Sequence, residues 1–379
     1  MSAGSIAASR KVQEVIFQCV NLKYNSNGDP TSPKIRLSIY ITGSYTKKTT
    51  NSAITIYRGK SGLTNDGGNF EPDTLAAGGY NGQYIIKGSL NLVSQISSVA
   101  IEDFTGYIDF QISDFIKAFP NCTYVSFTHS WMRLNGDISL FTNPNIVFLQ
   151  LGGYIIGNSP SENLVNLQTL NIFSQSGAGN NTISEIPNTL TLLSNLRIEG
   201  NNTISEIPEE LTNLTSVTIA GNNTISEIPN TLSLKTFIVG AQTASYTGTS
   251  TVSSIPYLPN IGTLQLFRNL GLTVDIANIV VNSIRNLILI DATGSTGSYT
   301  YSGASWPTNT MSTVRITARG IGLSSEEVDQ LLIDLSQVET WSTGSGGIIS
   351  IVGTNAPRTP ASDTAVATII SRGGNVITN

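Results

Sequence analysis

The octapeptide Asn-Asn-Thr-Ile-Ser-Glu-Ile-Pro occurs three times in this chain, at residues 180–187, 201–208 and 222–229. The copies are identical, and each begins 21 residues after the one before it. In a stack of coils each coil contacts only its neighbours, so equivalent coils can be duplicated without redesigning a shared core. The spacing therefore predicts a solenoid with one coil for each copy.

A second pattern precedes each copy. Leu193, Leu196 and Ile198 stand before the second copy with the spacing L-x-x-L-x-I, and apolar residues stand at the same spacing before the other two. The alternation of Leu196, Arg197 and Ile198 has the period of a short strand with one buried face. Each copy then supplies two further inward groups through Ile-x-x-Ile-Pro. We therefore expect one short strand in each coil.

This pattern resembles the leucine-rich repeat, L-x-x-L-x-L-x-x-N-x-L with a period of about 20 to 29 residues. Each identical copy carries one residue more than the family pattern, which leaves open whether Asn201 or Asn202 takes the buried asparagine position. A parallel β-helix, which is also a stack of coils, is the alternative fold. Degenerate apolar triplets extend the resemblance over about residues 95–350, and they begin at Ile96, Cys122, Ile146, Leu234, Ile261, Ile284 and Met311.

The predicted fold class is mostly β with short helices, in three parts. Residues 1–95 lack the repeat and alternate like antiparallel strands, which predicts a small N-terminal β domain. Residues 96–323 form the leucine-rich-repeat solenoid of short parallel strands. Residues 324–379 form a C-terminal α/β cap, because Ser324 and Glu327 make a capping box, Ser362 can cap a second helix, and strands are expected at residues 346–353 and 375–379.

Charge is distributed unevenly along the chain. Residues 1–60 carry nine Lys or Arg and two Asp or Glu, whereas the remainder carries eleven and twenty-three. This split predicts a basic N-terminal domain that docks to an acidic surface, with a solvated basic face as the alternative. The sequence contains no apolar run long enough to insert into a membrane, and its first residues lack a secretory signal pattern.

Few residues suit catalysis or metal binding. His129 is the only histidine, which excludes a His-rich metal centre, and no phosphate-binding loop or nucleic-acid motif is present. Glu185, Glu206 and Glu227 occupy equivalent positions in the three copies, which favours solvated surface over a catalytic carboxylate pair. We therefore expect a non-enzyme without cofactors or nucleic-acid partners. Cys19 and Cys122 are the only cysteines, and buried free thiols are favoured over a disulfide.

The last 26 residues resemble the C-terminal ends of some tailed-bacteriophage virion proteins. The likeness lies in the Asn355-Ala-Pro step, the Ala-rich helical segment, Gly373-Gly374 and the final Val-x-Thr-Asn. It implies a structural or adhesive component of the particle, such as a tail fibre, assembled in the bacterial cytoplasm. The N-terminal domain would contact other virion proteins, and the solenoid would contact a host surface protein, a glycan or a neighbouring virion protein.

Two other functions and the oligomeric state stay open. One function is that of a bacterial leucine-rich-repeat surface binding protein, and the less favoured one is that of a glycan-cleaving tailspike-type enzyme. A homo-oligomer is compatible with all of them.

The resemblance to leucine-rich repeats also implies where a ligand binds. In that family the strands line a concave face, and the residues between the core positions point outward. Phe173, Phe267 and Arg268 are the first candidates, although Phe173 could instead pack under the loop that follows it. The predicted binding residues are Phe173, Arg197, Glu199, Phe267, Arg268 and Arg315, and further outward positions are Gln150, Asn171, Thr218, Gln265 and Asp291.

Overall fold

The chain divides into two compact units, residues 1–180 and residues 181–379, called unit 1 and unit 2 below. The predicted boundary between residues 95 and 96 borders a segment outside the described residues, so the three-part division stays a prediction. The computed structural model describes residues 12–20, 35–41, 55–58, 61–63, 69–70, 82–89, 96–102, 107–111, 122–127, 133–152, 154–173, 182–200, 202–221, 223–240, 249–308, 310–342 and 347–379.

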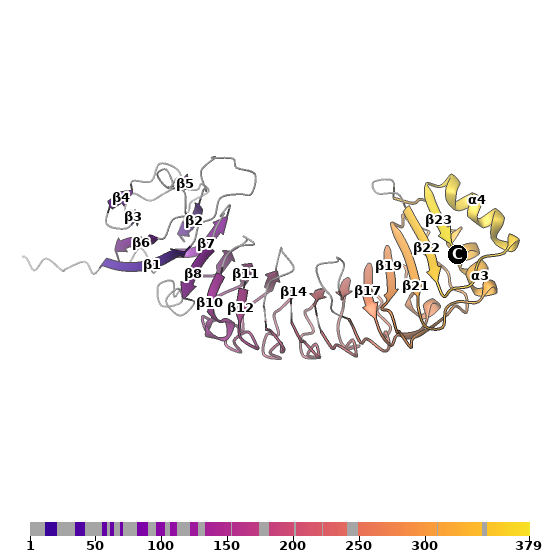
Figure 1. Ribbon diagram of the computed structural model, residues 1–379, viewed down its shortest axis with the longest axis horizontal. Helices are drawn as coiled ribbons and strands as arrows, with labels where there is room; N and C mark the ends of the chain where they lie inside the picture. Colours follow the sequence, from indigo (N-terminus) through magenta and orange to yellow (C-terminus); the bar gives the residue numbers. More distant parts are fainter. Residues whose placement is uncertain are drawn as a thin grey trace, which may run out of the picture. The chain divides into compact units, whose positions relative to one another are not determined.

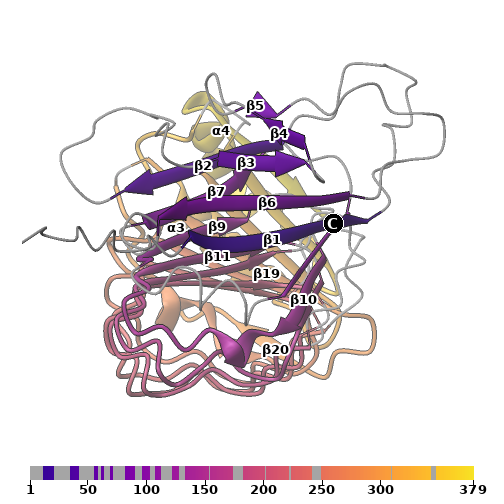
Figure 2. The ribbon, with the colours of Figure 1, turned by 90° about the vertical axis from the view of Figure 1, so that its left-hand side faces the viewer.

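The first part of unit 1 pairs its strands in the antiparallel sense, as the alternating sequence predicted. β1, β6 and β3 lie side by side in Figure 2, where β6 pairs with both of the others. β1 also pairs with β8, β3 with β4, and β2 with both β5 and β7. The strands are β1 (Val12–Val20), β2 (Ile35–Ile41), β3 (Thr55–Arg58), β4 (Ser61–Leu63), β5 (Asn69–Phe70), β6 (Gly82–Ser89), β7 (Ile96–Glu102) and β8 (Tyr107–Gln111).

The rest of unit 1 changes to parallel pairing, the arrangement that stacked coils require. Val125, Leu149 and Leu170 lie in register on adjacent strands and are all buried. The strands in this run are β7, β9 (Tyr124–Phe127), β11 (Phe148–Gly152) and β13 (Thr169–Phe173). β10 (Arg133–Asp137) pairs in parallel with β8 and with β12 (Tyr154–Ile156), and the short helix η1 (Ile138–Leu140) follows β10.

The cysteine and histidine predictions concern unit 1. Cys122 is a buried free thiol whose Sγ donates to the Tyr124 carbonyl at 3.1 Å. The thiol prediction is therefore confirmed for Cys122. Cys19 lies in β1 but its side chain is outside the described residues, as is the whole of His129.

Unit 2 is a stack of coils with one main strand in each. Figure 1 shows these strands along the upper side of the stack, and every adjacent pair is parallel. This arrangement fits a leucine-rich repeat. The strands are β14 (Asn195–Glu199), β15 (Ser216–Ala220), β16 (Thr236–Val239), β17 (Thr263–Asn269), β19 (Asn286–Asp291), β21 (Thr313–Ala318), β22 (Gly347–Gly353) and β23 (Gly374–Thr378). β18 (Thr273–Asp275) pairs separately with β20 (Ser298–Thr300), and η2 (Ile276–Ile279) follows β18.

The core of unit 2 is built from the predicted apolar positions. Ile198 and Ile219 lie in register, and both are fully buried, whereas Arg197 between two buried positions is exposed. The isoleucines of the octapeptide, such as Ile204 and Ile207, are also buried. Removing this apolar surface from water stabilises the stack by roughly 25 cal/mol for each Å². The predicted assignment of strand faces is confirmed.

The second asparagine of the octapeptide is buried in the second and third copies. Asn202 has an exposed fraction of 0% and Asn223 of 1%. Asn202 Nδ2 donates to the carbonyl of Gly200 in its own coil at 3.3 Å and to that of Ala220 in the next coil at 2.6 Å. The residue therefore links neighbouring coils through backbone groups that would be costly to bury alone. Asn202 therefore takes a buried asparagine position, while Asn201 lies outside the described residues.

Two short helices follow the repeat and were both predicted. α3 (Ser325–Leu335) begins with the expected capping box, in which Ser324 Oγ accepts from the Glu327 amide at 3.2 Å and Glu327 Oε2 accepts from the Ser324 amide at 2.8 Å. The inward face of α3 is buried as expected. η3 (Pro360–Ser362) leads directly into α4 (Asp363–Ser371).

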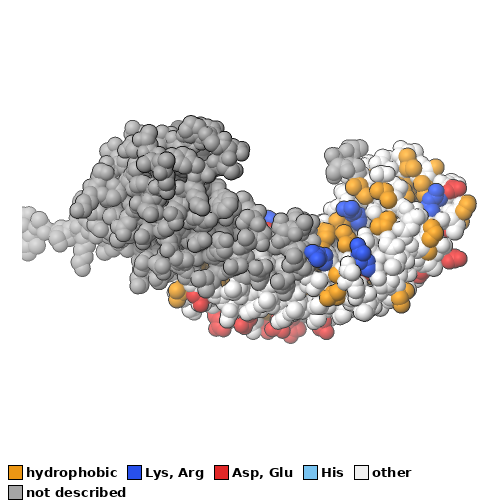
Figure 3. All heavy atoms as spheres, in the orientation of Figure 1, with side chains coloured by type: hydrophobic (Ala, Val, Ile, Leu, Met, Phe, Trp, Pro, Cys, Tyr) orange, Lys and Arg blue, Asp and Glu red, His pale blue; other side chains and the backbone are white. Residues whose placement is uncertain are grey.

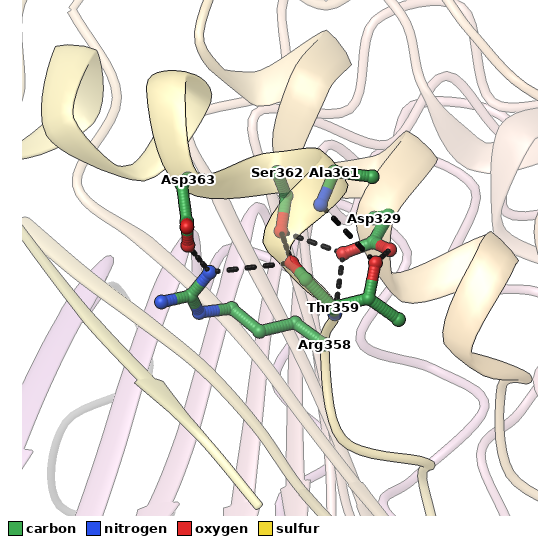
Figure 4. Close-up of polar contacts among 6 residues, drawn as sticks. All are labelled: Asp329, Arg358, Thr359, Ala361, Ser362 and Asp363. Carbon is green, nitrogen blue, oxygen red and sulfur yellow. Dashed lines mark hydrogen bonds and ion pairs between the residues drawn. The ribbon is translucent and has the colours of Figure 1, made fainter.

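Asp329 on α3 joins the two helical segments, as Figure 4 shows. Its carboxylate accepts from the Thr359 amide at 2.9 Å, from Thr359 Oγ1 at 2.5 Å and from Ser362 Oγ at 2.6 Å. Burial raises the pKa of Asp329, but these hydrogen bonds and the positive charge of Arg358 outweigh it, so the pKa lies below its ordinary value of 3.8. Ser362 is the N-cap residue of α4, as expected, but its hydroxyl makes no capping hydrogen bond and donates to the buried carboxylate instead.

Candidate binding surface

The outward side chains of the unit 2 strands form one continuous surface, called the strand surface below. Parallel pairing places side chains from successive coils in rows, about 4.8 Å apart. The middle row runs from β14 to β23 and mixes basic, polar and aliphatic residues. It consists of Arg197, Thr218, Ile238, Gln265, Ile288, Arg315, Ser350 and Ile377. Ile288 and Ser350 are buried members of this row.

Arg197 and Glu199 lie on β14 and form an ion pair. Arg197 Nη2 is 2.5 Å from Glu199 Oε1, and the two side chains are 52% and 16% exposed. The guanidinium of Arg197 also donates through Nε to the same carboxylate oxygen at 2.7 Å. Their opposite charges therefore compensate one another at this end of the strand surface.

Phe267 and Arg268 both reach the strand surface, although strict alternation would bury one of them. The register between β17 and β19 shifts here, so that Phe267 faces Ile290 while Asn269 faces Asp291. Arg268 is the extra residue of this bulge and has a φ of 54°, the sole positive φ among the described non-glycine residues. A left-handed conformation costs a residue with a side chain roughly 1–2 kcal/mol, so the surroundings must hold it in place.

Buried polar groups from two coils hold the bulge. Asn269 Oδ1 accepts from the amides of Gly271 and Leu272 at 2.9 Å each, and Asn269 Nδ2 donates to Ser250 Oγ at 2.8 Å. The Ser250 amide in turn donates to the Arg268 carbonyl at 3.2 Å. Gly240 lets the bulge approach the preceding coil, since a Cβ there would lie 2.0 Å from the Phe267 carbonyl oxygen.

Asp291 does not belong to the strand surface, contrary to the prediction. It is 2% exposed, and its carboxylate accepts from the Tyr299 hydroxyl at 2.6 Å and from the Arg319 amide at 2.9 Å. Burial, the hydrogen bond to Asp291 and its negative charge all raise the pKa of Tyr299, which keeps this hydroxyl a donor. Asp291 therefore holds the chain at the ends of β19 and β21 and presents no charge to a ligand.

Arg315 and Arg319 present their charges to solvent. Arg315 lies in the middle row on β21, and Arg319 follows the end of that strand. Both residues are exposed. Within the described residues their guanidinium groups form no ion pair or hydrogen bond, so both charges are available to a ligand.

Three of the predicted outward residues lie in unit 1. Gln150 and Asn171 are neighbours in register, and Asn171 Nδ2 donates to Gln150 Oε1 at 3.4 Å. Phe173 ends β13, but its side chain lies outside the described residues, so its role stays a prediction. Sequence reasoning missed the pair Tyr124 and Phe148, whose rings stack at 4.3 Å on neighbouring strands of unit 1. Both stand one position before a core residue, which marks them as outward positions.

The octapeptide glutamates lie outside the strands. Glu185, Glu206 and Glu227 are all exposed. Over the described ranges, no group of three or more His, Cys, Asp or Glu side chains is placed to hold a metal ion. No described helix is both long and apolar enough to cross a membrane.

Comparison with known proteins yields one distant structural likeness. The sequence matches no family model and no curated protein. Among solved structures, a leucine-rich-repeat protein of Leptospira interrogans is similar over 71% of this chain and 81% of its own, with 12% sequence identity and a TM-score of 0.35. At these values the match carries no weight by itself. The likeness to leucine-rich repeats rests on the repeated apolar triplets, the parallel strands in register and the buried asparagines of this chain.

Proposed function

We propose that this chain is a non-enzymatic binding protein that recognises its partner with the strand surface of unit 2. The observation that carries the proposal is the bulge at Arg268. Strained backbone persists where the surroundings hold it, and it is concentrated at binding and catalytic sites. Here the strain places Phe267 and Arg268 side by side on the surface, and aromatic and arginine side chains are the residues that dominate binding energy in many interfaces.

The test blocks the surface without changing the core. Thr317 is half-exposed and lies in the same row as Phe267 and Ile290, so a Thr317→Trp substitution covers this part of the strand surface. Glu206→Trp adds the same bulk at an exposed position outside the strands. Proteins and glycans captured by the immobilised full chain are compared among the wild type and both variants. The proposal expects binding to be lost with Thr317→Trp alone, and it fails if both variants bind like the wild type.

We further propose that the partner assembly is a bacteriophage particle, in which residues 1–95 dock to other virion proteins. The support is the likeness of residues 354–379 to the ends of virion proteins and the basic character of residues 1–60. Phage particles are purified on a density gradient from a lysed culture that produces this protein, and their proteins are identified by mass spectrometry. Stoichiometric amounts in the particle band support a virion protein, whereas recovery in the cell-envelope fraction alone favours a bacterial surface binding protein instead.

A further inference from the structure

Basic and acidic residues are segregated in the part of unit 2 between residues 182 and 342. This segment contains six Lys or Arg residues, and each lies in a strand of the main sheet or directly beside one. It also contains thirteen Asp or Glu residues, of which only Glu199 and Asp291 lie in those strands. In Figure 3 the red side chains gather mainly along the lower margin, and blue ones lie above them among orange ones.

The two acidic residues in the strands do not neutralise the rest of the surface. Glu199 is already paired with Arg197, and Asp291 is buried with both carboxylate oxygens bonded. From β16 onward the strand surface therefore carries positive charge, although acidic residues outnumber basic ones in the segment. The basic residues, called the basic patch below, are Lys235 and Arg285, which directly precede β16 and β19, and Arg268, Arg315 and Arg319, which lie in or directly after β17 and β21. The Arg285 guanidinium donates to the carbonyls of Asn282 and Ile284.

Apolar side chains lie between the cations. Ile238, Phe267 and Ile290 point outward from β16, β17 and β19 and are half-buried. Protein interfaces combine such an apolar centre with arginine, whereas proteins that bind single-stranded nucleic acid offer several aromatic rings for stacking bases. The described strands of this part of the sheet contain two aromatic residues, and of these Phe237 is fully buried, which leaves Phe267 as the partly exposed one.

We propose that the partner of the strand surface is a protein segment in which acidic side chains surround apolar ones. The basic patch attracts and orients the carboxylates, and the isoleucines and Phe267 bury the apolar residues. Charge complementarity also explains why the acidic residues of this segment lie elsewhere, because like charges facing the partner would repel it. This inference names the partner class of the site described under Proposed function and rests on that function.

The experiment measures fluorescence anisotropy of labelled probes with the intact full-length chain. The probes are a short peptide rich in Glu, Asp and Leu, its counterpart with Lys at every acidic position, heparin and a single-stranded oligonucleotide. The double variant Arg315→Gln/Arg319→Gln removes two positive charges from the patch. The control Thr203→Glu/Thr224→Glu changes the net charge by the same amount at two exposed positions outside the strands.

We expect the acidic peptide to bind, and the arginine variant to weaken it about tenfold at low ionic strength. The control should change the affinity by less than roughly twofold, because charges beyond a Debye length are screened. Equal effects of both variants, no effect of either, or binding of heparin or the oligonucleotide in preference to the peptide would overturn the inference. If Thr317→Trp abolishes peptide binding while the arginine variant does not, the strand surface is still the binding site and only the acidic preference fails.

Discussion

Ile198 and Arg197 are adjacent in β14, yet the structure predicts opposite consequences for their substitution. Ile198 has an exposed fraction of 0% and lies in register with Ile219 on the next coil. Ile198→Ala removes three carbon groups, worth roughly 2.4 kcal/mol of transfer free energy, and a cavity that cannot fully collapse adds to this. We expect a loss of about 2–5 kcal/mol in the free energy of unfolding.

Ile198→Asp should be more damaging still, because it buries a carboxylate without a partner. Arg197→Ala removes a surface ion pair with Glu199, and such pairs contribute about 0–1 kcal/mol. The measurement is urea unfolding of the full chain at neutral pH, followed by far-ultraviolet circular dichroism. Ile198→Val serves as a graded control with an expected loss of about 0.5–1.5 kcal/mol.

The refuting result is equal destabilisation by Arg197→Ala and Ile198→Ala. It would mean that the two side chains of β14 do not face opposite environments. The strand-surface assignment would then fail for the whole row that is in register with Arg197.

Three further predictions concern other parts of unit 2. Gly240→Ala should destabilise the protein by more than about 1 kcal/mol, because Gly240 has a φ of 94° and the added Cβ would meet the Phe267 carbonyl. Gly271→Ala should be nearly neutral, because the added Cβ would have no atom within 4 Å. Thermal melts of both variants check this difference. Folding lowers the pKa of Asp329, so its ionised carboxylate stabilises the fold at any pH above the pKa of the unfolded state. This stabilisation is lost as the pH falls from about 5 through the lower pKa of the folded state. The stability difference between the wild type and Asp329→Asn should therefore shrink over that range in urea titrations at successive pH values, and a constant difference would contradict the assignment. Replacing Glu185, Glu206 and Glu227 together by Gln should leave partner binding unchanged in a pull-down, since all three are exposed outside the strands. Loss of a glycan-cleaving activity in the folded triple variant would show that the non-enzyme proposal is wrong.

Features that depend on local periodicity could be predicted from the sequence. Leu196 and Ile198 alternate with Arg197, so the burial of the two apolar residues follows from their spacing. Ser324 and Glu327 have the spacing of a capping box, and the expected hydrogen bonds between them are formed. Features that depend on distant partners could not. The buried Asp291 accepts a hydrogen bond from Tyr299 in β20, and the Ser362 hydroxyl donates to Asp329 on another helix instead of capping its own.

The candidate site shows the same division. The sequence predicts Phe267 and Arg268 as outward residues, but it contains no glycine at position 268 to signal a left-handed turn. The bulge depends on Ser250 and Gly240, which belong to the preceding coil region and come close only after folding. Likewise the basic patch is not visible in the net charge of the segment, since it becomes apparent only when each cation is placed in or beside a strand of the main sheet.

The identical octapeptides have a consequence for how such a chain can vary. Asn202 bonds to the coil that follows it, and the next coil presents Asn223 in the same buried position. One more copy of these 21 residues, inserted between the two, would meet neighbours that already have the complementary shape. Each inserted or deleted coil would lengthen or shorten the sheet by one strand spacing of about 4.8 Å, with no change to the residues at either end. The length of the stack is thus set by the number of repeats, so gain or loss of a repeat in the gene would change the length without changing the residues that contact a partner.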